Sequence, residues 1–115
     1  MNKVIMTGRT TKDAELRYAS TGTAVANFTL AVDRGFGENK KTDFWRCVVW
    51  KGQAELVAER VGKGSKILIE GEIGINEWED REGNKRKDPE ITVQRVEFID
   101  LKNEQRQREP GEDDF

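Results

Sequence analysis

Apolar and polar residues alternate along most of the first hundred positions of this chain, and a repeat of two is the pattern of half-buried β-strands. The alternation is clearest in residues 24–33, where every second position holds Ala24, Ala26, Phe28, Leu30 and Val32. It recurs in residues 3–9, 43–51, 66–78 and 90–99, and we consider residues 14–18 a continuation of the first segment. These five segments predict an all-β protein. A change of phase between Val93 and Val96 predicts a β-bulge in the last strand.

One segment departs from this alternation. Between the third and fourth predicted strands, apolar residues recur at helical spacing at Ala54, Val57, Ala58 and Val61. Gly62 and Gly64 follow where a helix would end. Residues 1–102 are therefore predicted to form an all-β, five-stranded OB-fold Greek-key barrel with one short helix between strands 3 and 4. A small β-sandwich is the alternative, but a sandwich does not need a helix at that point.

The chain holds few of the residue types on which catalysis and metal binding depend. Its single cysteine, Cys47, cannot form an intrachain disulfide, and the lack of histidine removes Cys/His zinc sites and an imidazole base. Carboxylates gather in residues 77–82, but Arg81 lies among them, and such a mixed-charge run is typical of a solvated hairpin. We expect no catalytic residue, no metal and no cofactor, and we interpret Cys47 as a small buried apolar side chain.

The net charge of −2 is unevenly distributed along the chain. Residues 1–102 hold 18 basic and 17 acidic residues, whereas residues 103–115 hold 2 and 5. The last segment has no apolar period, which predicts a disordered acidic tail after the barrel. No apolar stretch is long enough to span a membrane and no signal-peptide pattern opens the chain, so we expect a cytoplasmic protein without membrane contact.

The third predicted strand carries large aromatic side chains on both of its faces. Alternation places Phe44 and Trp50 on the same side as Arg46, and an unpaired arginine is seldom fully buried. We therefore expect both rings to lie exposed on either side of a guanidinium group. Trp45 falls on the opposite, apolar side with Cys47, where we interpret it as core or subunit-interface packing.

Aromatic residues also occur beside basic ones elsewhere. The inward face of residues 66–78 is predicted to hold Ile67, Ile69, Ile73 and Ile75. This places Trp78 on the polar side of that strand, at the base of a hairpin that turns at Gly83-Asn84 and continues with three basic residues, Lys85, Arg86 and Lys87. Phe36 lies in the other long loop beside Arg34.

Exposed aromatics interleaved with basic side chains suit the binding of single strands without sequence preference, because every base has a face that can stack. We expect the basic residues beside these rings to contact phosphates; they are Arg34, Arg46, Lys85, Arg86 and Lys87. Two less specific interpretations remain open. Phe36 alone could be a core or interface residue, and the run from Lys85 to Lys87 could be a solubilising loop.

Short motifs follow one another in order and at regular spacing through residues 2–100. They are Asn2-Lys3-Val4-Ile5 with Gly8, Glu15-Leu16-Arg17-Tyr18, Gly22, Ala24-Val25-Ala26-Asn27 with Thr29-Leu30-Ala31, Arg46 with Val48-Val49, the stretch from Ala54-Glu55 to Lys63-Gly64-Ser65, and Ile69-Glu70-Gly71 with Trp78. Together they resemble the bacterial single-stranded DNA-binding protein family.

The resemblance implies a role for particular residues. It implies base stacking on Phe36, Phe44, Trp50 and Trp78, and phosphate contacts from Lys3, Arg46 and Lys63. It also implies a nucleoid-associated homotetramer with Trp45 at a subunit interface. In that family an acidic tip ending in phenylalanine recruits replication, recombination and repair proteins, and Asp113, Asp114 and Phe115 resemble this tip. The proline and apolar residue that usually precede the final phenylalanine are absent here.

Two functions of other classes stay open at this point. One is a barrel of the primosomal type that mainly contacts replication proteins and binds DNA weakly. The other is a metal-dependent nuclease that uses the clustered carboxylates.

Overall fold

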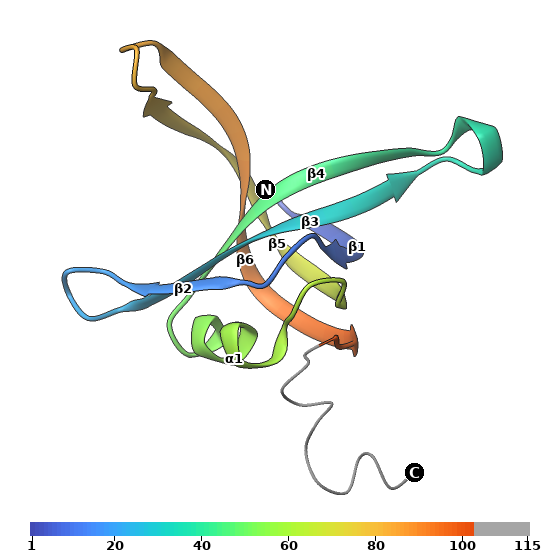
Figure 1. Cartoon of the computed structure of the whole chain (residues 1–115), viewed down its shortest axis with the longest axis horizontal. Helices are drawn as coiled ribbons and strands as arrows, with labels where there is room; N and C mark the ends of the chain where they lie inside the picture. Colours follow the sequence, from blue (N-terminus) through green and yellow to red (C-terminus); the bar gives the residue numbers. More distant parts are fainter. Residues whose placement is uncertain (103–115) are drawn as a thin grey trace, which may run out of the picture.

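The computed structural model describes residues 1–102, and the expectations for residues 103–115, including Asp113, Asp114 and Phe115, lie outside the described residues (Figure 1). The elements in chain order are β1 (Val4–Thr10), β2 (Glu15–Tyr18), β3 (Ala24–Arg34), the 3₁₀ turn η1 (Gly37–Asn39), β4 (Lys41–Trp50), α1 (Gly52–Arg60), β5 (Lys66–Glu79) and β6 (Lys85–Asp100). The short helix therefore lies where the sequence predicts it.

Five of the strands close into a ring. The sheet order is β1-β5-β6-β4-β3-β2, and an additional pairing of β1 with β3 joins the two sides through Arg9 opposite Ala31 and Thr10 opposite Leu30. The pairing of β4 with β6 is parallel and the others are antiparallel. This closed arrangement, with α1 between the third and fourth strands of the ring, confirms the predicted all-β fold.

The expected continuation of the first strand is a separate strand, β2. It pairs with the beginning of β3 from Glu15 opposite Asn27 to Tyr18 opposite Ala24, whereas β1 pairs with β3 only at Ala31 and Leu30. The two strands thus follow one another along β3, with residues 11–14 between them, and the structure shows six strands where five were expected.

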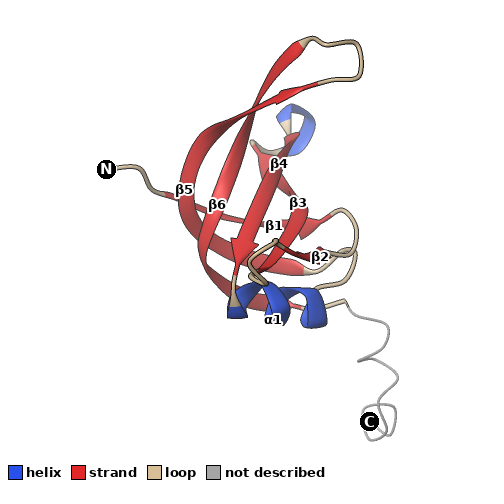
Figure 2. Cartoon of the chain, turned by 90° about the vertical axis from the view of Figure 1, so that its left-hand side faces the viewer, coloured by secondary structure: helices blue, strands red, loops and turns tan. Residues whose placement is uncertain are grey.

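The core lies inside the ring and is covered at one end by α1 (Figure 2). The helix buries Ala54 and Val57, and the chain just beyond it buries Val61. Strands contribute the remaining buried side chains, which include Phe28, Leu30, Val49, Ile67, Ile69 and Ile91. The alternation in the sequence thus reflects a barrel with one apolar and one solvated face.

The hairpin of β5 and β6 is longer than the sequence indicates. Its pairs continue to Glu79 opposite Lys85, so β6 begins at Lys85 and not near Glu90. Because this hairpin extends beyond the closed part of the sheet (Figure 1), Ile75 is 64% exposed, and its predicted place on the buried face is wrong.

The predicted β-bulge in the last strand is confirmed. Glu70 pairs with Arg95 and Gly71 pairs with Val93, which leaves Gln94 as the extra residue of β6. The backbone carbonyl of Gln94 accepts a hydrogen bond of 2.8 Å from the side chain of Gln53 at the start of α1. The bulge thus ties the helix to the sheet as well as bending the strand.

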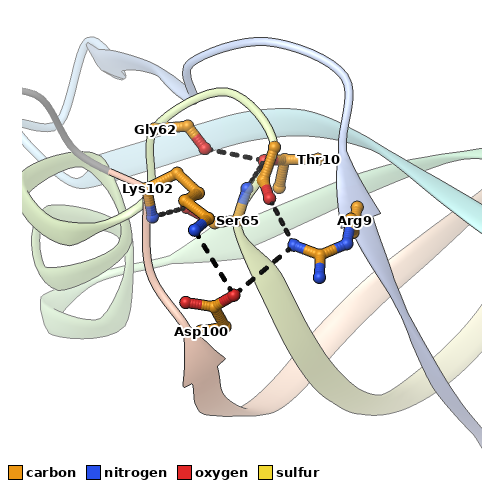
Figure 3. A network of polar contacts seen from close by, with 7 residues as sticks. Arg9, Thr10, Gly62, Ser65, Asp100 and Lys102 are labelled. Atoms are coloured by element: carbon orange, nitrogen blue, oxygen red, sulfur yellow. Dashed lines mark hydrogen bonds and ion pairs between the residues drawn. The ribbon is translucent and has the colours of Figure 1, made fainter.

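A network of polar contacts fastens the last described residues to the α1 end of the ring (Figure 3). The Arg9 guanidinium donates to the carbonyl of Gly64 at 2.8 Å and lies 3.8 Å from the Asp100 carboxylate. The backbone N–H of Lys102 donates to Ser65 Oγ at 2.8 Å. Lys102 therefore lies beside Ser65, in the segment that joins α1 to β5 (Figure 3), and the tip of the β5–β6 hairpin lies at the opposite end of the ring from α1 (Figure 2).

Candidate nucleic-acid interface

The outward face of β4 carries two aromatic rings on either side of a cation, as the sequence predicts. Phe44 is 65% exposed, Trp50 is 44% exposed, and Arg46 between them is also exposed. Val48 shares this face but is buried, and it lies opposite Asn27 of β3 and Thr92 of β6.

The other face of β4 points into the core. Cys47 is buried, as predicted, and burial, helped by the charge of Glu90, raises the pKa of its thiol to about 12. Trp45 is partly buried and packs against the core cluster, which agrees with the first of its two interpretations, core packing.

Strand register connects the β4 face to the β5–β6 hairpin. Arg46 lies opposite Glu90 on β6. Because every second residue of a strand lies on the same face, Asp88 and Arg86 share the face of Glu90. Arg86 lies opposite Trp78 of β5. The face that bears Phe44 and Trp50 therefore continues onto the hairpin as far as Trp78, which is 43% exposed.

The indole of Trp78 is held by a hydrogen bond. Its Nε1–H donates to Oδ2 of Asp88 at a nitrogen-to-oxygen distance of 2.5 Å. Asp88 is not among the residues that the sequence suggested, because its partner is set by the pairing of the two strands, which the sequence does not display.

The turn of this hairpin is organised by Asp80. Its carboxylate accepts from the backbone N–H of Asn84 at 2.8 Å, from that of Glu82 at 3.0 Å and from Arg86 Nε at 3.0 Å. The hydrogen bond from the Asn84 backbone is the main cause that lowers the pKa of Asp80. Gly83 has a φ of 83°, which suits glycine, so the turn falls where the sequence predicts it.

Phe36 lies in the loop between β3 and β4 and is 91% exposed. It precedes η1 and is flanked by Gly35 and Gly37, whose φ angles of 83° and 55° let the loop turn sharply around it. Within the described chain, the alternative that Phe36 is a core residue is therefore excluded. At the base of this loop, Arg34 Nε donates to Asp43 Oδ2 at 2.5 Å.

The basic residues proposed to contact phosphate fall into two groups. Four form ion pairs with carboxylates: Lys3 with Glu70 at 2.9 Å, Arg34 with Asp43 at 2.5 Å, Arg86 with Asp80 at 3.0 Å and Lys87 with Glu77 at 3.6 Å. Within residues 1–102, Arg46, Lys63 and Lys85 form no such pair and are exposed. This second group is available to a ligand without exchange of a partner.

A shallow pocket of about 300 Å³ adjoins Arg46. The side of the pocket away from β4 is formed by Lys12, Asp13 and Glu15 at the turn into β2, and Asn27 and Thr29 of β3 also line it. Sequence alternation did not suggest this pocket, because residues 11–14 and the strand β3 beside them are separated in the sequence.

Among residues 1–102, no three Cys, His, Asp or Glu side chains come together as a metal site. None of the helices in this part of the chain is long and apolar enough to cross a membrane.

A closed five-stranded ring with one helix between its third and fourth strands defines an oligonucleotide-binding fold, here with exposed aromatic residues along one face. The model of the single-strand binding protein family matches residues 1–99. The chain belongs to this family, which confirms the resemblance of its motifs.

The relatives with similar sequences have consistent names. A single-stranded DNA-binding protein of Halalkalibacterium halodurans is 40% identical over 118 aligned positions, which cover 100% of this chain and 70% of the relative. Single-stranded DNA-binding protein 2 of Listeria monocytogenes is 43% identical, with 90% of this chain and 66% of the relative covered. Single-stranded DNA-binding protein A of Bacillus subtilis is 42% identical, with 90% and 62% covered.

The chain thus spans roughly two thirds of the length of these three relatives, between 62% and 70%. The family and the names describe binding proteins and not enzymes, which confirms the prediction that the chain is not an enzyme.

Proposed function

We propose that the chain binds single-stranded DNA without sequence preference. Bases would stack on Phe36, Phe44, Trp50 and Trp78, while lysine and arginine side chains contact the phosphates. The observation that carries this proposal is the exposure of Phe44 and Trp50 on either side of Arg46 on one strand. Rings held in water on a rigid sheet offer stacking surfaces, each worth about 1–3 kcal/mol per base.

Charge supports a modest electrostatic contribution to binding. Arg46, Lys63 and Lys85 would contact phosphate directly, whereas Lys3, Arg34, Arg86 and Lys87 must exchange carboxylate partners for phosphates. Glu90 also lies on the outward face opposite Arg46. Few counterions are then released on binding, so the affinity should fall only gradually as salt rises.

Intrinsic tryptophan fluorescence titrated with oligo-dT tests the proposal. We expect quenching with single strands and little with duplex, whose paired bases hide their faces. Trp50→Ala should weaken binding by about fivefold to more than a hundredfold, the equivalent of one lost stack. A matched control is Tyr18→Ala, which removes an exposed ring from β2, outside the Arg46 face. Equal binding to duplex and single strands would contradict the proposal.

The biological role proposed for the chain is the one that the resemblance of its motifs to the single-strand binding family implies. It would protect single strands during replication, recombination and repair in the cytoplasm, associated with the nucleoid, and would assemble as a homotetramer. The partial exposure of Trp45 beside the core is compatible with a place at a subunit interface. Sedimentation with and without a long oligonucleotide tests assembly and stoichiometry together, and a monomer in both conditions would contradict the tetramer.

We further propose that Asp113, Asp114 and Phe115 recruit partner proteins. The attachment of Lys102 to Ser65 supports this, because it holds the last described residue beside α1, and the hairpin that carries Trp78 lies at the other end of the ring (Figure 2). A variant that lacks these three residues should lose partner capture from pull-downs with replication proteins and keep its affinity for oligo-dT. If partner capture is unchanged, the tip is not the recruiting element. If oligo-dT binding by the full chain is also weak, the primosomal type of interaction module is favoured.

A further inference from the structure

We infer that Asp88 is a positioning residue for DNA binding, which holds the indole of Trp78 in the orientation that receives a base. This inference rests on the proposed function and adds to it a residue outside the stacking and phosphate-binding sets. It is carried by the contact between Nε1 of Trp78 and Oδ2 of Asp88 and by the strand register around that contact.

The register gives this hydrogen bond a direction. Trp78 pairs with Arg86, so Asp88 lies two residues further along β6, toward the closed part of the ring. The indole nitrogen therefore points diagonally across the hairpin toward the barrel. An indole has a single N–H donor, and its hydrogen bond restricts the rotation of the side chain. The side chain of Trp78 is still 43% exposed, so the bond leaves ring surface open to a ligand.

The carboxylate of Asp88 does not neutralise the basic side chains that neighbour it in the sequence. Arg86 bonds to Asp80 at 3.0 Å and Lys87 pairs with Glu77 at 3.6 Å, so both basic neighbours have other carboxylates. Within the described residues, Asp88 itself forms no ion pair. The partner of Asp88 in the structure is the indole of Trp78.

A carboxylate at this place has two opposite effects on DNA binding. Its negative charge repels phosphates, which weakens binding. Its hydrogen bond restricts the rotation of the indole before a base arrives, so less conformational entropy is lost on stacking. The two effects can be separated by substitution, because an asparagine keeps an oxygen acceptor but carries no charge.

The experiment compares Asp88→Asn with Asp88→Ala in oligo-dT binding at fixed salt. Both variants remove the charge, but Asp88→Ala also removes the acceptor. We expect Asp88→Asn to bind at least as tightly as the unsubstituted chain. Asp88→Ala should bind roughly threefold to tenfold more weakly than Asp88→Asn, the size expected for one hydrogen bond of about 1 kcal/mol.

Trp78→Phe provides the matched background, since phenylalanine keeps a stacking ring but has no N–H. In this background, Asp88→Asn and Asp88→Ala should bind equally, which removes any effect of alanine on the strand itself. A difference of the same size in both backgrounds would overturn the inference.

A spectroscopic measurement keeps the test independent of affinity. The Nε1–H proton of Trp78 should exchange more slowly with solvent in the unsubstituted chain and in Asp88→Asn than in Asp88→Ala. Equal exchange in all three proteins would show that Asp88 does not bond to the indole, and would overturn the inference.

Trp78→Ala separates a failure of this inference from a failure of the proposed function. If that variant weakens binding but Asp88→Asn and Asp88→Ala bind equally, stacking on Trp78 stands and positioning by Asp88 fails.

Discussion

Gly71 lies so close to Thr92 on the neighbouring strand that a Cβ atom on this glycine would be 2.1 Å from the Thr92 carbonyl oxygen. The contact occurs at the β-bulge, where Gly71 pairs with Val93 and the register of the hairpin shifts. A backbone carbonyl cannot move away without breaking the sheet, so glycine is required there by space and not by an unusual φ angle.

Gly71→Ala should therefore destabilise the protein by about 1–3 kcal/mol or more, the usual range for overpacking. Gly74→Ala is the matched control on the same strand, because a Cβ at Gly74 has nothing within 4 Å. Urea denaturation measures both. Equal stabilities of the two variants would show that the sheet can relax around position 71.

Thr10→Val tests the polar network at the α1 end of the ring. The buried Thr10 hydroxyl donates to the Gly62 carbonyl at 2.8 Å and accepts from the Ser65 N–H at 3.1 Å. Valine has nearly the same shape but removes both hydrogen bonds, while the Ser65 N–H keeps its 3.2 Å hydrogen bond to the Gly62 carbonyl. We therefore expect a loss of about 0.5–1.5 kcal/mol in the free energy of unfolding. Thr7→Val, at an exposed position of β1, should change it by less than about 0.5 kcal/mol.

Cys47 should be unreactive in the folded protein. Burial raises the pKa of its thiol to about 12, so almost no thiolate is present at pH 8, and the side chain is also out of reach. Modification by a disulfide reagent such as DTNB should be at least about a hundredfold slower than in guanidinium chloride. Rapid modification without denaturant would mean that β4 opens frequently at its centre.

Asp80 should titrate below the ordinary range of an aspartate, because the Asn84 backbone N–H and Arg86 favour its charged form and so lower its pKa. A lowered pKa in the folded state means that the carboxylate stabilises the hairpin turn above the ordinary aspartate pKa of about 4. This stabilisation is lost as the pH falls through the lowered value. NMR titration of the Asp80 carboxyl carbon measures the midpoint, and a midpoint at or above about 4 would contradict the geometry.

The same argument applies to a variant. The Asn84 amide, which donates to Asp80 at 2.8 Å, should lose protection from hydrogen exchange in Asp80→Ala at pH 6. Below the lowered pKa, the unsubstituted chain should approach the variant. A pH-independent difference would mean that the charge of Asp80 is not what orders the turn.

Alternation was sufficient to predict which side chains of β4 face outward, because a strand has only two faces and Arg46 identifies the solvated one. It placed Phe44 and Trp50 correctly for that reason. Alternation failed for Ile75, because it predicts on which face of a strand a residue lies but not how far along the strand that face is covered by the barrel.

Side-chain contacts between strands could not be predicted from the sequence. The bond between Trp78 and Asp88 depends on the register of β5 against β6, which is set by the turn around Asp80 and the bulge at Gln94. The ion pairs of Lys3 and Arg34 likewise join residues whose proximity follows from strand pairing. The sequence therefore suggested the cations but not which of them are already occupied.

The hydrogen bond between Lys102 and Ser65 also determines how the molecule can be handled. A biotin or a surface linker attached just beyond Lys102 would begin beside α1, while the hairpin with Trp78 points the other way (Figure 2). Molecules immobilised through that point would present the tip of the β5–β6 hairpin, which carries Trp78, to the solution.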